Sequence, residues 1–249
     1  MAKIKKEIQH PRRMPTEGAF MSFKIDDIIY GYLQGIATYN PQENRVYLTE
    51  KSFQDAKIVL GDLIGRTART VSRKIDVLMS EENSLLMFDE EKRQYYFPYD
   101  QMKKYCVVSA EILQQLTSVY NRMAVRVYIY LLDKYLWKEK EGNTYDFTIK
   151  ELKTAFGYSS STRGSAGTQI EMVLKNILEN LKNNHFIDYE DYYDTEHSVH
   201  PVPRKLLTFV AQTAEEKGHS FEEEHNVKTS ENDYDAYERW WRERYGGQN

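Results

Sequence analysis

Residues 48–97 read LTEKSFQDAKIVLGDLIGRTARTVSRKIDVLMSEENSLLMFDEEKRQYYF, and this stretch decides the fold. Thr49 has the type of side chain that caps a helix, and the apolar residues after it recur at helical spacing. These apolar residues are Phe53, Ile58, Val59, Leu63 and Ile64. Gly61 and Gly65 supply flexible backbone where a sharp turn between two helices needs it. We therefore expect one helix from Thr49 and a tight turn before a second.

The second helix is predicted over residues 66–79, with one apolar and one basic face. Val71, Ile75, Leu78 and Met79 fall at i, i+4, i+7 and i+8, so we expect this face to be buried. The rest of the surface carries basic and hydroxyl side chains, which suits insertion into the major groove of DNA. The residues expected to contact DNA here are Arg66, Thr67, Arg69, Thr70, Arg73 and Lys74.

A hairpin is predicted next, because the apolar runs 85–88 and 94–97 flank the charged residues 89–93. Two helices followed by a hairpin indicate a winged helix-turn-helix. Lys92 and Arg93 are candidates for phosphate contacts at the tip of the wing, although three acidic neighbours oppose them: Asp89, Glu90 and Glu91.

Composition limits the class of protein. The chain has 249 residues, of which 41% are hydrophobic, enough to bury the core of one or two domains. We find no apolar run of roughly 20 residues and no signal-peptide core, so we expect no membrane partner. The single cysteine, Cys106, excludes an internal disulfide and fits a cytoplasmic location.

The net charge of −4 is unevenly distributed. Residues 211–249 hold ten acidic and five basic residues, which leaves the rest of the chain slightly positive. Residues 1–20 are predicted to be a basic flexible arm, either without a role or in contact with phosphates or the minor groove. Local positive charge of this kind is compatible with a nucleic-acid partner.

Residues 103–210 repeat the order of helix, strand, helix, helix and hairpin. Residues 148–151 and 168–171 both have capping-box spacing, which predicts helices that start at Thr148 and at Thr168. The strands of a second wing are expected at 185–189 and 205–210. The second of these helices has balanced charges, so Arg163 in the preceding loop is the remaining candidate for an anion contact; a flexible linker is the alternative. The helix at 122–137 could instead make this unit a dimerisation domain.

No enzymatic signal is found, and we expect neither catalytic residues, nor a cofactor, nor a metal. A Gly-rich loop ending in Gly-Lys-Ser/Thr is missing from the sequence, as is the paired-histidine spacing of rolling-circle nickases. The C-terminal tail carries aromatic residues at helical spacing after an acidic linker. It is interpreted as a partner-binding peptide or as a segment that packs back on the chain, and its candidate residues are Tyr237, Trp240, Trp241 and Tyr245.

Four short segments carry a family resemblance. The segment GRTARTVSRKIDVL, residues 65–78, looks like the recognition region of a winged-helix DNA-binding domain. The segments SAEILQQL, NRMAVRVYIYLLDKY and FTIKELKTAFGYSS resemble tandem winged-helix replication initiators of plasmids and phages. The DnaD-like primosomal proteins are the second resemblance, although a clear helical C-terminal domain of their kind is missing. The first resemblance implies two winged helices that bind origin repeats, one of which can also dimerise.

The sequence thus predicts an α+β, mainly helical chain with two winged helix-turn-helix domains in tandem and a flexible acidic tail ending in an aromatic helix. The expected parts are a basic arm (1–20), a first domain (21–102), a second domain (103–210) and the tail (211–249). The expected partners are double-stranded DNA, a second copy of the chain, and a replisome protein that binds the tail. A primosome scaffold and a transcriptional or partition regulator remain alternatives to a replication initiator.

Overall fold

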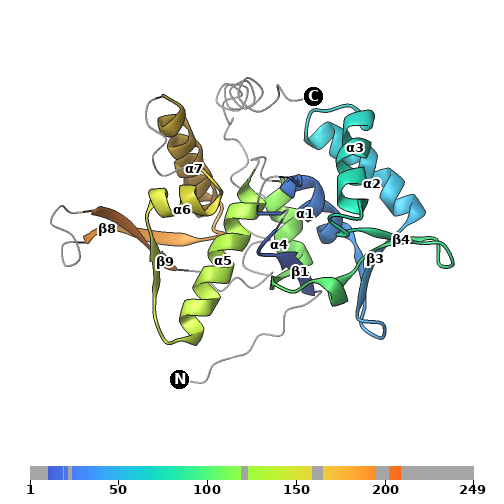
Figure 1. Ribbon diagram of the computed structural model, residues 1–249, viewed down its shortest axis with the longest axis horizontal. Coiled ribbons are helices and arrows are strands. Elements are labelled where there is room, and N and C mark those ends of the chain that lie inside the picture. The colour runs from blue at the N-terminus through green and yellow to red at the C-terminus, as the bar shows by residue number, and fades with distance from the viewer. Residues whose placement is uncertain are drawn as a thin grey trace. The chain divides into compact units, whose positions relative to one another are not determined.

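The computed structural model describes residues 11–18, 20–21, 24–118, 123–158, 165–194 and 202–208 (Figure 1). About half of these residues are helical and the strands form small antiparallel sheets, which confirms the α+β class. The helices are α1 (Asp27–Ile36), α2 (Glu50–Leu63), α3 (Ala68–Met79), α4 (Ala110–Ser118), α5 (Ala124–Lys140), α6 (Ile149–Ala155) and α7 (Ser165–Asn183), with a 3-10 turn η1 (Tyr99–Gln101).

The strands belong to three sheets. The first pairs β1 (Pro11–Pro15) with β6 (Tyr105–Ser109). The second has the order β2-β3-β5-β4, from β2 (Thr38–Asn40), β3 (Arg45–Thr49), β4 (Met87–Asp89) and β5 (Gln94–Phe97). The third has the order β7-β9-β8, from β7 (Tyr145–Phe147), β8 (Asp188–Asp194) and β9 (Val202–Thr208).

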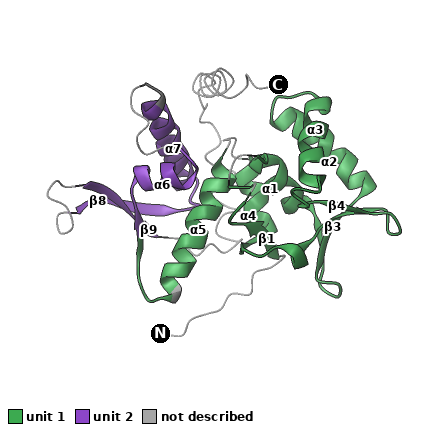
Figure 2. Ribbon diagram, in the orientation of Figure 1, with its two compact units in different colours: residues 1–145 green, residues 146–249 purple. Residues whose placement is uncertain are grey.

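Packing divides the chain into unit 1, residues 1–145, and unit 2, residues 146–249 (Figure 2). This division falls later than the boundary expected after residue 102, because α4 and α5 both pack against α1. Two glycines of α1 permit the close approach. A Cβ at Gly31 would lie 3.1 Å from Val125 Cγ1 of α5, and one at Gly35 would lie 3.0 Å from Gln114 Cγ of α4. Larger side chains at these positions would force the helices apart.

The expectation of a flexible basic arm is wrong for residues 11–15, which form β1. Arg12 is 2% exposed and donates from Nε to the Gln34 carbonyl at 2.6 Å and from Nη2 to the Ala37 carbonyl at 2.5 Å. These two carbonyls lie at the C-terminal end of α1, where helix carbonyls lack intrahelical partners. Arg12 is therefore a structural residue of unit 1, and residues 1–10 lie outside the described part of the chain.

The first motif of the fold consists of β3, α2, α3, β4 and β5. The predicted helix, turn, helix and hairpin are all present, and the Thr49 cap is confirmed because its side chain accepts from Ser52 N. Leu48 is opposite Tyr95, whose ring stacks on Phe53 with centroids 3.7 Å apart. The buried side chains contributed by the two helices are Phe53, Ala56, Leu60, Val71, Ile75 and Leu78.

Three apolar side chains of these helices are exposed: Met79, which was expected to be buried, and Ile58 and Val59, which belong to the apolar pattern that predicted α2. Ile58 is 67% exposed, Val59 is 46% exposed and Met79 is 36% exposed. Ile58 and Val59 are exposed because of the geometry of α2. This helix buries only Phe53, Ala56 and Leu60, at i, i+3 and i+7. Ile58 and Val59 fall between those positions and face outward.

The second motif consists of β7, α6, α7, β8 and β9, and repeats the strand–helix–helix–hairpin order. The capping box at the start of α6 is confirmed, since Thr148 Oγ1 accepts from Glu151 N and Glu151 accepts from Thr148 N. The second predicted box is wrong: α7 begins at Ser165, so Thr168 is an interior residue of the helix.

The hairpin of the second motif starts later than predicted. β8 begins at Asp188, because His185 has a φ of 56° and turns the chain, and Phe186 N donates to the Leu181 carbonyl at 2.8 Å. Phe186 and Ile187 are consequently buried in the turn after α7 rather than in a strand. β9 covers Val202–Thr208, whereas residues 209 and 210, expected in this strand, lie outside the described residues.

Candidate nucleic-acid interface

The start of α3 is fixed by three local features. Gly65 has a φ of 59°, a left-handed conformation that favours glycine and ends α2. A Cβ at Gly61 would lie 3.2 Å from the Arg66 carbonyl oxygen, so the small residue lets the turn close. Thr67 caps α3 by accepting from Thr70 N, and the two threonine hydroxyls lie 3.2 Å apart. Thr67 and Thr70 thus hold the beginning of the helix in place.

The outward face of α3 carries two arginines that have no partner among the residues the structure describes. Val71, Ile75 and Leu78 are buried on the opposite face. Arg69 and Arg73 are exposed and lie one turn apart, and within the described residues neither makes an ion pair or a hydrogen bond. Arg66, partly exposed, precedes the cap. Two guanidinium groups on a rigid, capped helix are available to an external anion or base edge.

Lys74 belongs to a different environment from Arg69 and Arg73. Its Nζ lies 2.5 Å from Asp26 Oδ2, and Asp26, whose side chain is 7% exposed, also caps α1 by accepting from Ile29 N. Asp26 therefore joins α1 to α3. The structure makes Lys74 an anchor of α3 rather than a free cation of its surface.

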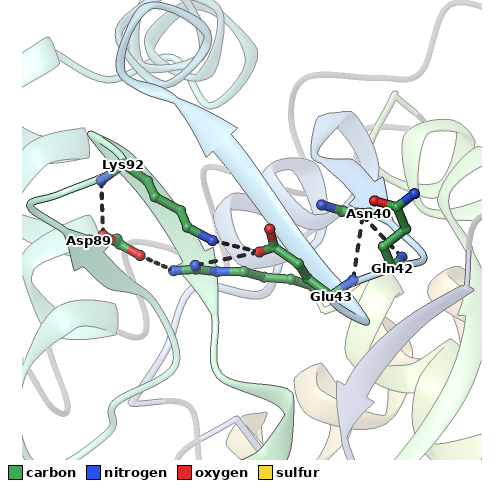
Figure 3. Close-up of polar contacts among 6 residues, drawn as sticks. Asn40, Gln42, Glu43, Asp89 and Lys92 are labelled. Atoms are coloured by element: carbon green, nitrogen blue, oxygen red, sulfur yellow. Dashed lines mark hydrogen bonds and ion pairs between the residues drawn. The ribbon is translucent and has the colours of Figure 1, made fainter.

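The two cations at the tip of the β4–β5 hairpin are also paired. Lys92 Nζ lies 2.8 Å from Glu43 Oε2 in the β2–β3 turn (Figure 3). Arg93, with a φ of 51°, lies with its Nη2 2.7 Å from Glu50 Oε2 in the first turn of α2. Glu90 and Glu91, by contrast, are exposed and make no contact of this kind to any residue the structure describes. The charged side chains that stay unpaired at the hairpin tip are therefore acidic.

Behind the hairpin lies a polar cluster that the sequence did not reveal. Arg45 Nη2 donates to Asp89 Oδ2 at 2.8 Å, and its guanidinium carbon lies 3.9 Å from the centre of the Tyr96 ring. Asp89 Oδ1 also accepts from Lys92 N at 3.0 Å, which shapes the turn (Figure 3). A pocket of about 500 Å³ opens beside this cluster and is lined by Arg13, Glu43, Asn44, Arg45, Asp89, Tyr96, Phe97, Tyr99 and Asp100. Arg45, Asp89 and Tyr96 come from three different strands, and the pairing of β3 and β4 with β5 brings them together.

The pKa of Asp89 reflects this arrangement. The hydrogen bond from Lys92 N, followed by that from the Arg45 side chain, holds the pKa of Asp89 below its ordinary value. The carboxylate is therefore charged over a wide pH range, and it keeps the guanidinium of Arg45 bound to the sheet.

The corresponding helix of the second motif, α7, has balanced charges. Lys182 Nζ lies 2.7 Å from Asp188 Oδ1, and Lys153 of α6, which is 2% exposed, lies 3.4 Å from Glu171. Lys175 is exposed without a partner among the described residues, but it has acidic neighbours along the same helix. This surface offers little excess positive charge to a phosphate backbone.

The apolar face of α5, considered as a dimerisation surface, is largely used inside unit 1. Val125, Val127 and Ile129 are fully buried. Leu136 and Trp137 near the end of the helix remain 43% and 63% exposed. The part of α5 available to a partner is thus much smaller than the sequence pattern suggested.

Several predicted sites fall outside the described residues. These are Arg163 and the tail residues Tyr237, Trp240, Trp241 and Tyr245. In the described ranges, the structure contains no group of three or more His, Cys, Asp or Glu side chains arranged to hold a metal ion. Nor does any described helix have the length and apolar character needed to cross a membrane. No protein-family model, curated protein or solved structure matches the chain.

Proposed function

We propose that the chain binds double-stranded DNA and reads its sequence with α3. The observation that carries the proposal is the pair Arg69 and Arg73, exposed and unpartnered among the described residues, on a capped helix whose opposite face is buried. A helix of this kind fits the major groove, where arginine binds the O6 and N7 atoms of guanine in a bidentate manner. Thr67 and Thr70 would act by fixing the angle at which α3 enters the groove.

The order of the elements supports interpreting both motifs as winged helices. In each, a strand is followed by two helices and a hairpin, and the sheets have the equivalent orders β3-β5-β4 and β7-β9-β8. On this interpretation the first motif is the sequence reader, since only its second helix presents unpaired arginines among the described residues.

The biological role that we propose is initiation of plasmid or phage replication at repeated origin sequences, by a homodimer. Its support is the resemblance of the sequence to tandem winged-helix initiators, together with the duplicated motif. A fold of this kind serves several processes, so the role depends on the DNA site and not on the fold.

The test is binding to DNA fragments from the gene's own locus across a salt series. Arg69→Ala combined with Arg73→Ala should weaken binding to one preferred fragment by about 30-fold or more, given about 1–3 kcal/mol for each arginine–base contact. The matched control is Lys103→Ala with Lys134→Ala, which removes the same charge from exposed positions of unit 1 and should leave the preference intact.

Weak binding that is independent of the fragment and unchanged in the arginine variant would overturn the proposal. Repeats within the preferred fragment, each protected from nuclease cleavage by the protein, would support the initiator role. A preferred site confined to the gene's own promoter would instead indicate a transcriptional regulator.

A further inference from the structure

The wing of the first motif contains two basic residues, and the fold pairs each of them with a carboxylate. Lys92 extends back along the sheet to Glu43, and Arg93 extends to Glu50. Both acids come from other elements: Glu43 from the β2–β3 turn and Glu50 from the start of α2. Each wing-tip cation therefore has a carboxylate fixed beside it by the fold.

Glu43 lies close to two cations, Lys92 and Arg45. Its Oε2 accepts from Lys92 at 2.8 Å (Figure 3). The same atom lies 3.9 Å from Arg45 Nη1, while Arg45 is held mainly by Asp89. The side chains of Glu43 and Lys92 are 44% and 45% exposed, so the pair is accessible to competing ions. A DNA phosphate would have to displace Glu43 to bind Lys92.

Two further acidic residues also weaken the binding of DNA phosphates at the wing. Glu90 and Glu91 lie at the tip of the same hairpin, exposed and without a partner in the part of the chain that the structure describes. Unpaired carboxylates at this position repel a phosphate backbone. The salt dependence of DNA binding counts the cations that neutralise phosphates, and a cation already paired within the protein does not add to that count in full.

We propose that Glu43 and Glu50 limit sequence-independent affinity by competing with DNA phosphates for Lys92 and Arg93. This inference rests on the proposed DNA-binding function. The wing then contributes little to the binding of arbitrary DNA, and the contacts of Arg69 and Arg73 decide which sites are occupied.

The experiment measures the salt dependence of binding to a duplex of unrelated sequence. Glu43→Gln and Glu50→Gln each remove one carboxylate charge and free one cation. Each should raise the affinity and steepen the slope of log K against log salt concentration by about 0.9, the value expected for one added phosphate contact. Exposed ion pairs add little to stability, and circular dichroism and thermal unfolding verify that the variants stay folded.

Glu90→Gln is the matched control, because it removes the same charge from the hairpin that carries Lys92 and Arg93 without releasing a cation. It should raise affinity less than Glu43→Gln does. Lys92→Gln supplies a second test: in the wild-type background it should change the slope little, whereas in the Glu43→Gln background it should abolish the gain. Equal effects of Lys92→Gln in both backgrounds, or equal effects of Glu43→Gln and Glu90→Gln, would overturn the inference.

The two proposals fail in different ways. If the arginine double variant binds DNA as well as the wild type does, the proposed function fails. If that variant loses its preferred fragment but Glu43→Gln and Glu50→Gln leave the salt slope unchanged, only the competition by Glu43 and Glu50 is refuted.

Discussion

The first and second motifs have the same connectivity but use their cations differently. In the first motif, Arg69 and Arg73 of α3 have no partners among the described residues, while Lys74 forms an ion pair with Asp26. In the second motif, Lys182 binds Asp188 at the start of the following strand. The same order of strands and helices therefore produces one surface with available positive charge and one that is balanced. Function is to be sought in the side chains that each motif leaves unpaired, and not in the topology the motifs share.

The largest expected effects come from the cores, and they test whether the motifs belong to separate units. Ile75 is 2% exposed in α3 and Ile177 is fully buried in α7. Replacing either with alanine should cost about 2–5 kcal/mol of unfolding free energy. Hydrogen exchange should show lost protection in the described residues of unit 1 for Ile75→Ala and in those of unit 2 for Ile177→Ala.

The exposed Ile58 provides the control for this pair, since Ile58→Ala should change protection little. Equal loss of protection in both units from either core substitution would show that the chain unfolds as a single cooperative unit, contrary to this expectation.

The second comparison concerns DNA affinity and uses one exposed cation from each motif. Arg69→Ala should weaken binding to the preferred fragment by about 1–3 kcal/mol, because the base contact that we propose for Arg69 would be lost. Lys175→Ala should have almost no effect, because its helix carries balancing acids. Fluorescence anisotropy with a labelled duplex measures both. A comparable loss in Lys175→Ala would identify α7 as a second reader of DNA and would remove the distinction between the motifs.

A smaller effect is expected at the helix caps. Thr67 caps α3, and Thr148 forms the capping box of α6. Each change to alanine should cost about 1 kcal/mol of stability by leaving a backbone N–H unpaired, and serine should restore most of it. Denaturant unfolding measures the loss. Thr67→Ala should also reduce DNA affinity, whereas Thr148→Ala should not. Comparing the two variants therefore distinguishes a loss of stability from a loss of DNA recognition.

The smallest effect is a dependence on acid. Hydrogen bonds from Lys92 N and Arg45 lower the pKa of Asp89, and a hydrogen bond from the Lys182 side chain lowers that of Asp188. An unfolded aspartate titrates at about 3.9, so the stability from these contacts is present above that pH and is lost as the pH falls toward the folded pKa. Carboxyl chemical shifts followed by NMR should place both pKa values below the ordinary one. Asp89→Asn should remove the acid response of the first hairpin alone.

What the sequence predicted well depends on local signals. The helix from Thr49, the turn at Gly65, α3 and the hairpin after it are all specified by neighbouring residues, through apolar spacing, caps and glycines. The predicted starts of helices were less accurate where a local signal was ambiguous. Residues 148–151 and 168–171 have identical capping-box spacing, yet only the first is a cap, because residues before Thr168 are already helical.

The features that the sequence did not predict depend on residues distant in the chain. Arg69 and Lys74 look alike in the sequence, and only the fold places Asp26 beside Lys74. The partners of Lys92 and Arg93 come from the β2–β3 turn and the start of α2. The number of basic residues in a sequence cluster is therefore an upper limit on the number of unpaired cations that the folded surface presents.

The buried Arg12 has a practical consequence for handling the protein. Arg12 and Arg13 form a dibasic pair that trypsin would cleave quickly in an open tail, but β1 pairs with β6 over its whole length and Arg12 is enclosed. Cleavage there requires unit 1 to open first, so the rate of proteolysis at this bond reports that opening. A shortened chain that starts at residue 21 would lose a strand of the core, and any affinity tag is best attached before residue 11.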